Sequence, residues 1–305
     1  MNSLEGQTLG FVGLGLMGRP MCLNLSQAGA RMIVHNRSRG VIDEIRGPRI
    51  QAADSPAEVA RSAPTVVLML TDTKAVEQVL FGPDGLVEGL RPGSLVIDMG
   101  TTAVTTTREI AKRLGRQDVG FIDAPVSGGQ IGAVAGTLAI MAGGEAQTIE
   151  RAQPLFEVLG SSFTHVGDPG AGQVAKAANQ VIVGLNIGAV AEAIALVESA
   201  GVDPAKVRQA LMGGFAASRI LEVHGQRMIE RAFDPGAKVT TQVKDLEQAI
   251  ELGSLLGQRL PATELSLSLY RSLVDRGQGG LDHSALIKAL QDEDANLANP
   301  STDPC

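Results

Sequence analysis

Two short stretches of this sequence combine residue types that can do chemistry. The stretch GAGQVAKAANQ, residues 170–180, places Lys176 and Asn179 three residues apart in an otherwise small and apolar segment. In a helix, this spacing puts both side chains on one face. A lysine there can act as an acid, because burial lowers the pKa of an ammonium group while its charge polarises a carbonyl. From the residues alone, Lys176 could equally be a surface cation whose stem lies along the helix.

The second stretch is FVGLGLMGRPM, in which three glycines follow the G-x-G-x-x-G spacing. It comes directly after an apolar run and opens a helical pattern, which is the context that a dinucleotide-binding fingerprint requires. The glycines then allow a tight turn, close approach of the backbone to the pyrophosphate and close helix packing, with the phosphates at the helix N-terminus. The predicted cofactor contacts of this loop are Gly13, Leu14, Gly15, Leu16, Met17 and Gly18.

The end of the next apolar run, VHNRS, indicates which dinucleotide fits the site. An acidic residue at this position bonds the ribose 2′-hydroxyl of NAD and repels a 2′-phosphate. Here Asn36 stands at that position and is followed by Arg37 and Ser38. A neutral donor, a cation and a hydroxyl suit a phosphate, so we expect NADP(H) to be preferred, with NAD(H) possible. The alternative is that Arg37 is a solvated loop cation.

A third stretch, DAPVSGGQIGAVAGTLAIMAGG, spans residues 123–144 and is too rich in glycine for an ordinary turn between strands. Its Ser127, Gly128 and Gly129 offer a hydroxyl beside backbone N–H groups. Such a group of donors can hold a carboxylate. A tight turn with no ligand is the alternative for these three residues.

The elements that must position these residues begin with a series of predicted strands. From Leu9 to about Val166, short runs rich in Val, Ile and Leu alternate with helical stretches. This alternation predicts a mostly parallel, doubly wound sheet. The strand pattern disappears after GDPGAG, residues 167–172. We therefore expect a dinucleotide-binding Rossmann domain over residues 1–168.

The remainder of the chain has a helical pattern to about Leu290. It begins with a run to Ala200 that would form one helix about 45 Å long. We expect a helical substrate and oligomerisation domain over residues 169–305. Its last part, 291–305, is polar without periodicity, which is typical of a disordered tail.

Composition and charge exclude several classes of partner. The 305 residues carry a net charge of −7, and they include no Trp and one Tyr. This balance argues against nucleic acid, whose recognition uses clustered cations and stacking aromatic side chains. We therefore expect no nucleic-acid partner.

The start of the chain shows no signal-peptide pattern, and the two cysteines, Cys22 and Cys305, form no disulfide framework. These features favour a cytoplasmic protein. The most apolar region, 181–197, is interrupted by Asn186 and Glu192, which favours a buried helix over a membrane span.

Four motifs occur in order along the chain: GLGLMGRPMCLNL, DAPVSGGQIGAVAGT, GAGQVAKAANQ and KDLEQA. With them the sequence resembles the β-hydroxyacid dehydrogenase family, which includes 3-hydroxyisobutyrate dehydrogenase, tartronate semialdehyde reductase and the glyoxylate/succinic semialdehyde reductases. The resemblance covers nearly the whole chain. The stretches NQVIVGLNI, GGFAASRIL and GLDHSAL are most similar to the tartronate semialdehyde reductase branch.

The resemblance implies an α/β Rossmann N-terminal domain and an all-α C-terminal domain of the 6-phosphogluconate dehydrogenase type, joined by a long interdomain helix. It also implies a homodimer or homotetramer, and an active site in the cleft between the domains. Lys176 is then the general acid/base, with Asn179 beside it. The implied substrate contacts are Thr101, Ser127, Gly128, Gly129 and Asp245. The further implied cofactor contacts are Met69, Leu70, Thr71, Thr101 and Lys244.

Two positions depart from the family pattern. Gly100 in DMGTT replaces the usual serine, and Ala237 stands where relatives often carry an aromatic residue after the proline. A pocket altered at Ala237 could take a different substrate. We expect Ser218 to cap a helix and Arg219 to lie at the surface, although both could recognise the far end of a substrate.

No metal site is predicted, because His283 and the other histidines lack metal-ligand spacing. We expect His283 to be structural or interfacial.

The leading hypothesis is a reductase that interconverts a small carboxylate-bearing semialdehyde or 2-oxo acid with its hydroxy acid. The leading pair of compounds is tartronate semialdehyde and glycerate. Hydride transfer from a nicotinamide to a carbonyl carbon requires a proton donor, here Lys176, at the carbonyl oxygen. The alternatives are a 3-hydroxyisobutyrate or serine-type dehydrogenase, a glyoxylate or succinic semialdehyde reductase, an imine reductase, and a non-catalytic NADP-binding scaffold. Relatives that reduce imines lack the lysine, and silent scaffolds usually lose it, so the presence of Lys176 counts against both.

Overall fold

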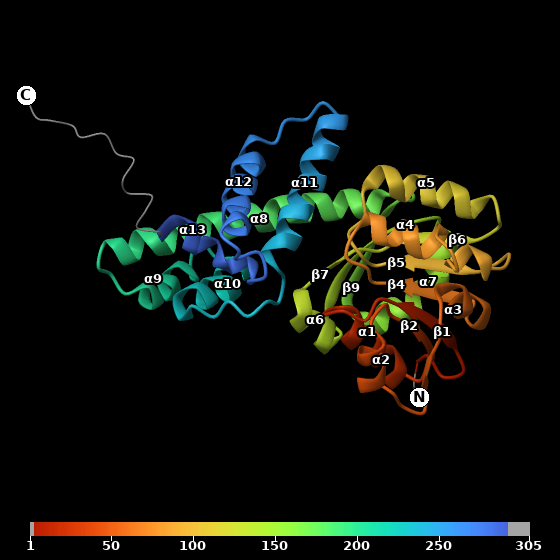
Figure 1. The fold of residues 1–305 in the computed structure, drawn as a ribbon. Helices are drawn as coiled ribbons and strands as arrows, with labels where there is room; N and C mark the ends of the chain where they lie inside the picture. The colour runs from red at the N-terminus through yellow and green to blue at the C-terminus, as the bar shows by residue number, and fades with distance from the viewer. Residues whose placement is uncertain (1–2, 292–305) are drawn as a thin grey trace, which may run out of the picture. The chain divides into compact units, whose positions relative to one another are not determined.

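The computed structural model describes residues 3–291, and the chain divides into two compact units after Ala177. The first unit contains a nine-stranded sheet with helices around it (Figure 1). Its strands are β1 (Thr8–Val12), β2 (Arg31–His35), β3 (Ile50–Ala52), β4 (Thr65–Leu68), β5 (Leu95–Asp98), β6 (Gly120–Asp123), β7 (Val126–Ser127), β8 (Leu138–Gly143) and β9 (Gly160–Gly167). Its helices are α1 (Gly18–Gln27), α2 (Gly40–Glu44), α3 (Pro56–Ser62), α4 (Thr73–Phe81), η1 (Leu86–Glu88), α5 (Val104–Gly115), α6 (Gly129–Ala135) and α7 (Ala146–Leu159).

The sheet has the strand order β3-β2-β1-β4-β5-β6-β8-β7, with β9 paired to β8. The strands from β3 to β6 are all parallel, and their order is that of dinucleotide-binding domains. The strand β8 runs antiparallel to β6 and β7 but parallel to β9. In such a sheet, ligands bind outside the carboxyl ends of the strands, next to the point where the strand order reverses.

Both faces of the sheet are buried at the central strands β1, β4, β5 and β6, which explains why these strands are apolar without alternation. Residues on one face, such as Phe11 and Ile97, pack with Met21 of α1 in one hydrophobic cluster. The neighbouring residues Val12 and Val96 belong to a second cluster, which covers the other face together with α3, α4 and α5. The two faces thus give this unit two hydrophobic cores.

The second unit consists of helices around one hydrophobic core. The long helix α8 (Ala171–Ser199) begins in the first unit and continues into this one. The other helices are α9 (Pro204–Leu211), α10 (Arg219–Glu230), α11 (Val239–Leu255), α12 (Pro261–Asp275), η2 (His283–Ile287) and α13 (Lys288–Gln291). Ile187 and Ile194 of α8 pack in this core with Leu246 and the fully buried Tyr270.

Several helix starts follow directly from local sequence. Asp203 precedes Pro204 and accepts a hydrogen bond of 2.9 Å from the Ala205 N–H, as expected for an N-cap before a first-turn proline. Ser55 caps α3 before Pro56 in the same way. These caps satisfy backbone donors that the helix leaves unpaired.

Seven of the nine observed strands coincide with the short apolar runs LGFVGLG, RMIVHN, TVVLML, SLVIDMG, GFIDAPV, TLAIMAGG and SSFTHVG, which predict strands between Leu9 and about Val166. The other two, β3 and β7, have only three and two residues, which is too short for a periodicity to be recognised. The predicted boundary at 168/169 precedes α8, whereas the division into units falls within that helix. The predicted disordered tail, 291–305, lies outside the described residues apart from Gln291.

By length and composition alone, α8 could also cross a membrane. The core helices of soluble proteins pass the same test. Within the described residues, α8 supplies part of the core of the second unit, but only 33% of its most apolar 18-residue stretch is buried, so the helix is less buried than the sequence predicts.

Glycines allow the start of α8 to pack closely on the sheet. Gly170 has a φ of +92°, which favours glycine. At Gly172, a Cβ would lie 2.5 Å from the carbonyl oxygens of both Asp123 and Met141. At Gly143 in β8, a Cβ would lie 2.7 Å from the Gly172 amide nitrogen. Of the two glycines in the GAGQVAK motif, Gly172 is therefore required by the contact between α8 and the sheet, and Gly170 by its backbone conformation.

We expect Gly172→Ala to lower the free energy of unfolding by about 1–3 kcal/mol, because the added methyl group overpacks a site closed by backbone atoms. Chemical denaturation measures this loss. Gly115→Ala in α5 is the matched control, since nothing lies within 4 Å of its added Cβ; it should leave stability unchanged or raise it by up to about 1 kcal/mol. Equal stabilities of Gly172→Ala and wild type would contradict the close packing.

Candidate active site and cofactor site

The glycine loop between β1 and α1 has the geometry of a phosphate-binding turn. Gly13 has a φ of +100°, and a Cβ there would lie 2.3 Å from the Met69 carbonyl oxygen. A Cβ on Gly18 would lie 1.9 Å from the Gly13 carbonyl oxygen, whereas nothing lies within 4 Å of one on Gly15. The three glycines thus serve the turn, the packing of α1 and open approach to the backbone. The loop residues fit the pyrophosphate of a dinucleotide.

The loop after β2 is joined to this turn by Asn36. Its Oδ1 accepts a 3.0 Å hydrogen bond from the Leu14 N–H, and its Nδ2 donates to the Ser38 carbonyl oxygen at 2.9 Å. Arg37 and Ser38 are exposed. Arg39 pairs with Asp54, whereas Arg37 makes no ion pair within residues 3–291. Asn36 therefore shapes the loop and leaves the Arg37 guanidinium facing solvent beside it.

The other predicted cofactor contacts of the first unit follow neighbouring parallel strands. Met69, Leu70 and Thr71 come directly after β4, and Thr101 comes shortly after β5. All four are partly or fully exposed. They lie at the carboxyl edge of the sheet, on the same edge as the glycine loop.

Lys176 is buried, with 8% of its surface exposed. Its Nζ donates a 2.8 Å hydrogen bond to the Val126 carbonyl oxygen in β7. The residue that follows is Ser127, and then Gly128 and Gly129 both adopt positive φ angles of 132° and 60°. The structure therefore brings Lys176 to the beginning of the Ser-Gly-Gly turn, and it excludes the surface-cation alternative for this lysine.

The first unit also contains two buried carboxylates, Asp98 and Asp123, to which the sequence prediction assigned no role. Asp98 ends β5, Asp123 ends β6, and the two are register partners with no exposed surface. Burial raises the pKa of Asp123 to about 7, although hydrogen bonds from the Gly170 and Gln173 N–H groups lower it. The neighbouring Asp98 charge raises it further.

In the second unit, a chain of polar groups joins α8 to α11. The Asn179 Nδ2 donates to Gln180 Oε1 at 2.8 Å, and Gln180 Nε2 donates to Asp245 Oδ2 at 2.5 Å. The Lys244 Nζ lies 3.0 Å from the other oxygen of Asp245, which is 3% exposed. The structure thus brings together Asn179, Lys244 and Asp245, and it adds Gln180, which sequence reasoning missed.

The two departures from the family pattern occupy restricted positions. A Cβ on Gly100 would lie 2.9 Å from the Leu70 carbonyl oxygen, so a serine there would require a shift of the backbone. The Ala237 N–H donates to Asp282 Oδ2 at 3.1 Å, and its carbonyl oxygen accepts from the His283 N–H at 2.8 Å. Ala237 is therefore held by its backbone.

His283 is buried and faces another histidine. Its Nε2 lies 3.4 Å from His224 Nε2, and its Nδ1 lies 3.3 Å from Gln242 Oε1. Burial would raise the pKa of Asp282 beside them, but His224, His283 and the Ser284 hydrogen bonds outweigh burial and hold that pKa well below its ordinary value.

His224, Asp282 and His283 have ligand atoms within 4.8 Å of one another. Both Asp282 oxygens already accept hydrogen bonds, from Gly236 and Ser284 among others. We therefore interpret this cluster as a hydrogen-bonded network. The histidines are 59 residues apart, so sequence spacing could not reveal it.

Ser218 and Arg219 take local roles. The Ser218 Oγ caps α10 by accepting a 3.0 Å bond from the Leu221 N–H, and Arg219 pairs with Glu222 at the surface.

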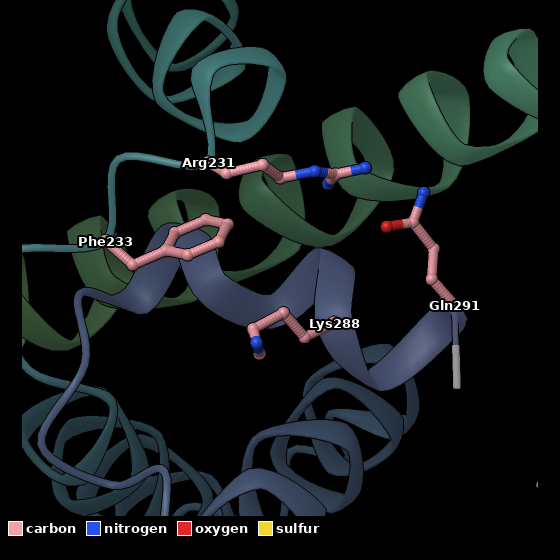
Figure 2. Close-up of a pocket in the computed structure, with 4 residues that line it drawn as sticks. All are labelled: Arg231, Phe233, Lys288 and Gln291. Carbon is pink, nitrogen blue, oxygen red and sulfur yellow. The ribbon is translucent and has the colours of Figure 1, made fainter. Parts of the chain in front are cut away.

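Figure 2 shows a pocket of about 350 Å³ in the second unit, lined by Arg231, Phe233, Lys288 and Gln291. Arg231 and Gln291 both bond Glu198, and the Lys288 Nζ lies 5.9 Å from the Phe233 ring centroid. None of the predicted site residues lines this pocket.

Comparison with known families matches both parts of the chain. Residues 8–167 match the profile described as the NAD binding domain of 6-phosphogluconate dehydrogenase. Residues 170–290 match the profile described as the NAD-binding region of NADP-dependent 3-hydroxyisobutyrate dehydrogenase. Together the two profiles cover nearly all of the described residues.

Individual relatives cover almost the full chain. It is 45% identical to 2-hydroxy-3-oxopropionate reductase of Escherichia coli (strain K12) over 93% of this chain and 97% of that enzyme. A crystal structure of 3-hydroxyisobutyrate dehydrogenase from Salmonella typhimurium matches with a TM-score of 0.84 and 30% identity, over 92% of this chain and 99% of that one. The structure of Psf3 in complex with NADP+ and 2-OPP matches with a TM-score of 0.87 and 26% identity, over 93% and 100%.

We expect Arg37→Ala to weaken NADPH binding by about 10- to 100-fold, the value of a charge-assisted bond to a phosphate. Binding of NADH should change little, because NADH lacks the 2′-phosphate. Fluorescence titration with each cofactor measures both constants. Arg39→Ala is the control, since Arg39 is paired with Asp54. Equal losses for NADPH and NADH would contradict the assignment of Arg37.

Proposed function

The chain belongs to the 3-hydroxyisobutyrate dehydrogenase-like family of NAD(P)-dependent oxidoreductases, and we propose that it reduces tartronate semialdehyde (2-hydroxy-3-oxopropionate) to glycerate. The observation that carries this proposal is a buried lysine held at the turn that can bind a carboxylate. The 45% identity to a reductase of that name supports the choice of substrate.

The nicotinamide cofactor supplies the hydride when it is bound. Lys176 contributes the proton: its Nζ donates to the substrate oxygen as negative charge develops there. Before that, its ammonium charge polarises the carbonyl, and this effect is strong because Lys176 is buried. In the reverse direction, the same Nζ accepts the proton from the hydroxyl group.

The Ser127-Gly128-Gly129 turn binds the substrate carboxylate in this proposal. Both glycines adopt positive φ angles, which turn successive backbone N–H groups toward one side and create a site for an anion. The Ser127 hydroxyl adds a further donor. The bond from Lys176 to Val126, one residue earlier, places the acid next to the group that orients the substrate.

We propose Asn179 and Asp245 of the second unit as further substrate contacts, as the family resemblance implies. Gln180 joins the two by hydrogen bonds of 2.8 and 2.5 Å. This linkage fixes the side chains before a substrate arrives, so little conformational entropy is lost on binding. A substrate with hydroxyl or aldehyde groups beside its carboxylate suits these polar partners.

Imine reduction and a non-catalytic scaffold are less consistent with the site. Neither function explains why the chain buries the Lys176 ammonium group, since burying a charge costs free energy even when it donates one hydrogen bond, as here to Val126. A solved imine reductase and a solved reductive aminase are 20% and 21% identical to this chain, and similarity at that level shows the fold alone.

Lys176→Ala should lower kcat for semialdehyde reduction by about 10²- to 10⁴-fold, the usual contribution of a general acid. The dissociation constant for NADPH should stay unchanged, because the glycine loop is intact. Steady-state kinetics and cofactor titration measure the two effects. Lys206→Ala, at an exposed lysine of α9, serves as the control. Turnover above a few per cent of the wild-type value, with normal cofactor binding, would show that Lys176 is not the acid.

A substrate panel tests the choice of substrate. Tartronate semialdehyde, glyoxylate and succinic semialdehyde are offered for reduction, and 3-hydroxyisobutyrate and L-serine for oxidation, each with both cofactors. We expect the highest kcat/KM for tartronate semialdehyde with NADPH. A higher value for any other compound would replace tartronate semialdehyde as the substrate and leave the role of Lys176 intact.

A further inference from the structure

Asp123 is a buried carboxylate that has no assigned role in the proposed reaction. Its Oδ1 accepts a 2.7 Å hydrogen bond from the Gly170 N–H, and its Oδ2 accepts a 2.8 Å bond from the Gln173 N–H. These donors belong to the residue before α8 and to the first turn of that helix. Because a carboxylate is planar and rigid, two such bonds fix both the position and the rotation of the turn.

Gln173 joins the same turn to the loop after β5. Its Nε2 donates to the Gly100 carbonyl oxygen at 2.9 Å, and its Oε1 accepts from the Thr102 N–H at 3.1 Å. Asp98 holds the loop from the other side, since its oxygens accept bonds from the Gly100 N–H at 3.0 Å and the Thr102 hydroxyl at 2.6 Å. Thr101 therefore lies between two residues, Gly100 and Thr102, that are both held by hydrogen bonds to Asp98 and Gln173.

Lys176 follows Gln173 by three residues, so it lies one turn further along α8 than the first turn, which is hydrogen-bonded to Asp123. A rotation or shift of the first turn would move the Lys176 Nζ away from the Val126 carbonyl oxygen, to which it is now 2.8 Å distant. Position matters at this level, because misplacement of a reacting group by about 1 Å can cost about 100-fold in rate.

We propose that Asp123 is a positioning residue of the reductase: with Gln173, it fixes the first turn of α8 to the carboxyl ends of β5 and β6, so that the Lys176 ammonium and the Thr101 loop keep one relative geometry. The proposal rests on the proposed function, in which Lys176 donates the proton.

The cost of burying Asp123 supports a role beyond stability. Desolvation raises the pKa of this carboxyl group, and the Asp98 charge on the neighbouring strand adds to the cost. Replacing buried charged groups by apolar residues of similar volume is often neutral or stabilising. A carboxylate is nevertheless well suited here, since it alone among side chains of this size offers two oxygens that accept two N–H groups.

A double-mutant cycle with Asp123→Asn and Lys176→Ala tests the proposal. Asparagine keeps the shape but replaces one acceptor by an NH₂ group, which opposes the N–H of Gly170 or Gln173. The single-turnover rate of NADPH oxidation is measured with the semialdehyde that gives the highest turnover in the panel. We expect Asp123→Asn to lower this rate by about tenfold or more when Lys176 is present, with KM and the NADPH dissociation constant within about twofold.

In the Lys176→Ala background, the same change should alter the rate by less than about twofold, because the group that Asp123 positions is absent. Equal losses in the two backgrounds, or no loss with Lys176 present, would overturn the proposal. If Lys176→Ala itself has full activity, the acid assignment fails, and the positioning role fails with it. A loss for Lys176→Ala with additive effects overturns the positioning role alone.

Two further variants distinguish the proposed role of Asp123 from a general loss of folding. Thr107→Val removes a buried hydroxyl of the same unit outside this network, and it should leave the rate unchanged. If Asp123→Asn does not fold, the cycle is run with Gln173→Met, which keeps the side-chain length and removes both bonds to the loop. We expect Gln173→Met to lower the single-turnover rate when Lys176 is present and to leave it nearly unchanged in the Lys176→Ala background.

Discussion

Two hydrogen bonds from the start of α8 to the carboxylate of Asp123 connect the chemistry of this protein to its sheet. Asp123 ends β6, which pairs in parallel with β5. Its position is therefore set by the sheet of the first unit. The helix begins at that carboxylate, and Lys176 lies in its second turn. The bond from Lys176 to Val126 closes the arrangement on the Ser127 turn. The proposed acid, the proposed carboxylate site and the glycine loop therefore all depend on the carboxyl edge of one sheet.

This arrangement requires glycine where backbones approach one another. Gly172 and Gly143 allow the helix to contact β6 and β8. Gly13 allows the turn after β1 to contact Met69 after β4, and Gly18 allows α1 to contact that turn. Gly15 has a different role, because the space beside it is open. Glycines that look alike in the sequence thus serve either packing or access of a ligand, and only the surrounding atoms distinguish these roles.

The sequence predicted the features that local patterns encode. Apolar runs located the long strands, the G-x-G-x-x-G spacing located the cofactor loop, and the motif around Lys176 identified it as the acid candidate. It could not predict features that depend on distant partners. Gln173 bonds residues about seventy positions earlier in the chain, and Gln180 bonds Asp245, 65 positions later. Asp123 belongs to a recognised motif, but its role follows only from the two N–H groups that a distant segment brings to it.

The most direct test of this account is the exchange rate of the Gly170 and Gln173 amide hydrogens, measured above the pKa of Asp123 in wild type and in Asp123→Asn. The account predicts slow exchange of both hydrogens in the wild-type chain. It also predicts faster exchange at one or both in the variant, with the amides of β1 unchanged. Equal exchange rates at both positions in the two chains would contradict the claim that Asp123 holds the start of α8.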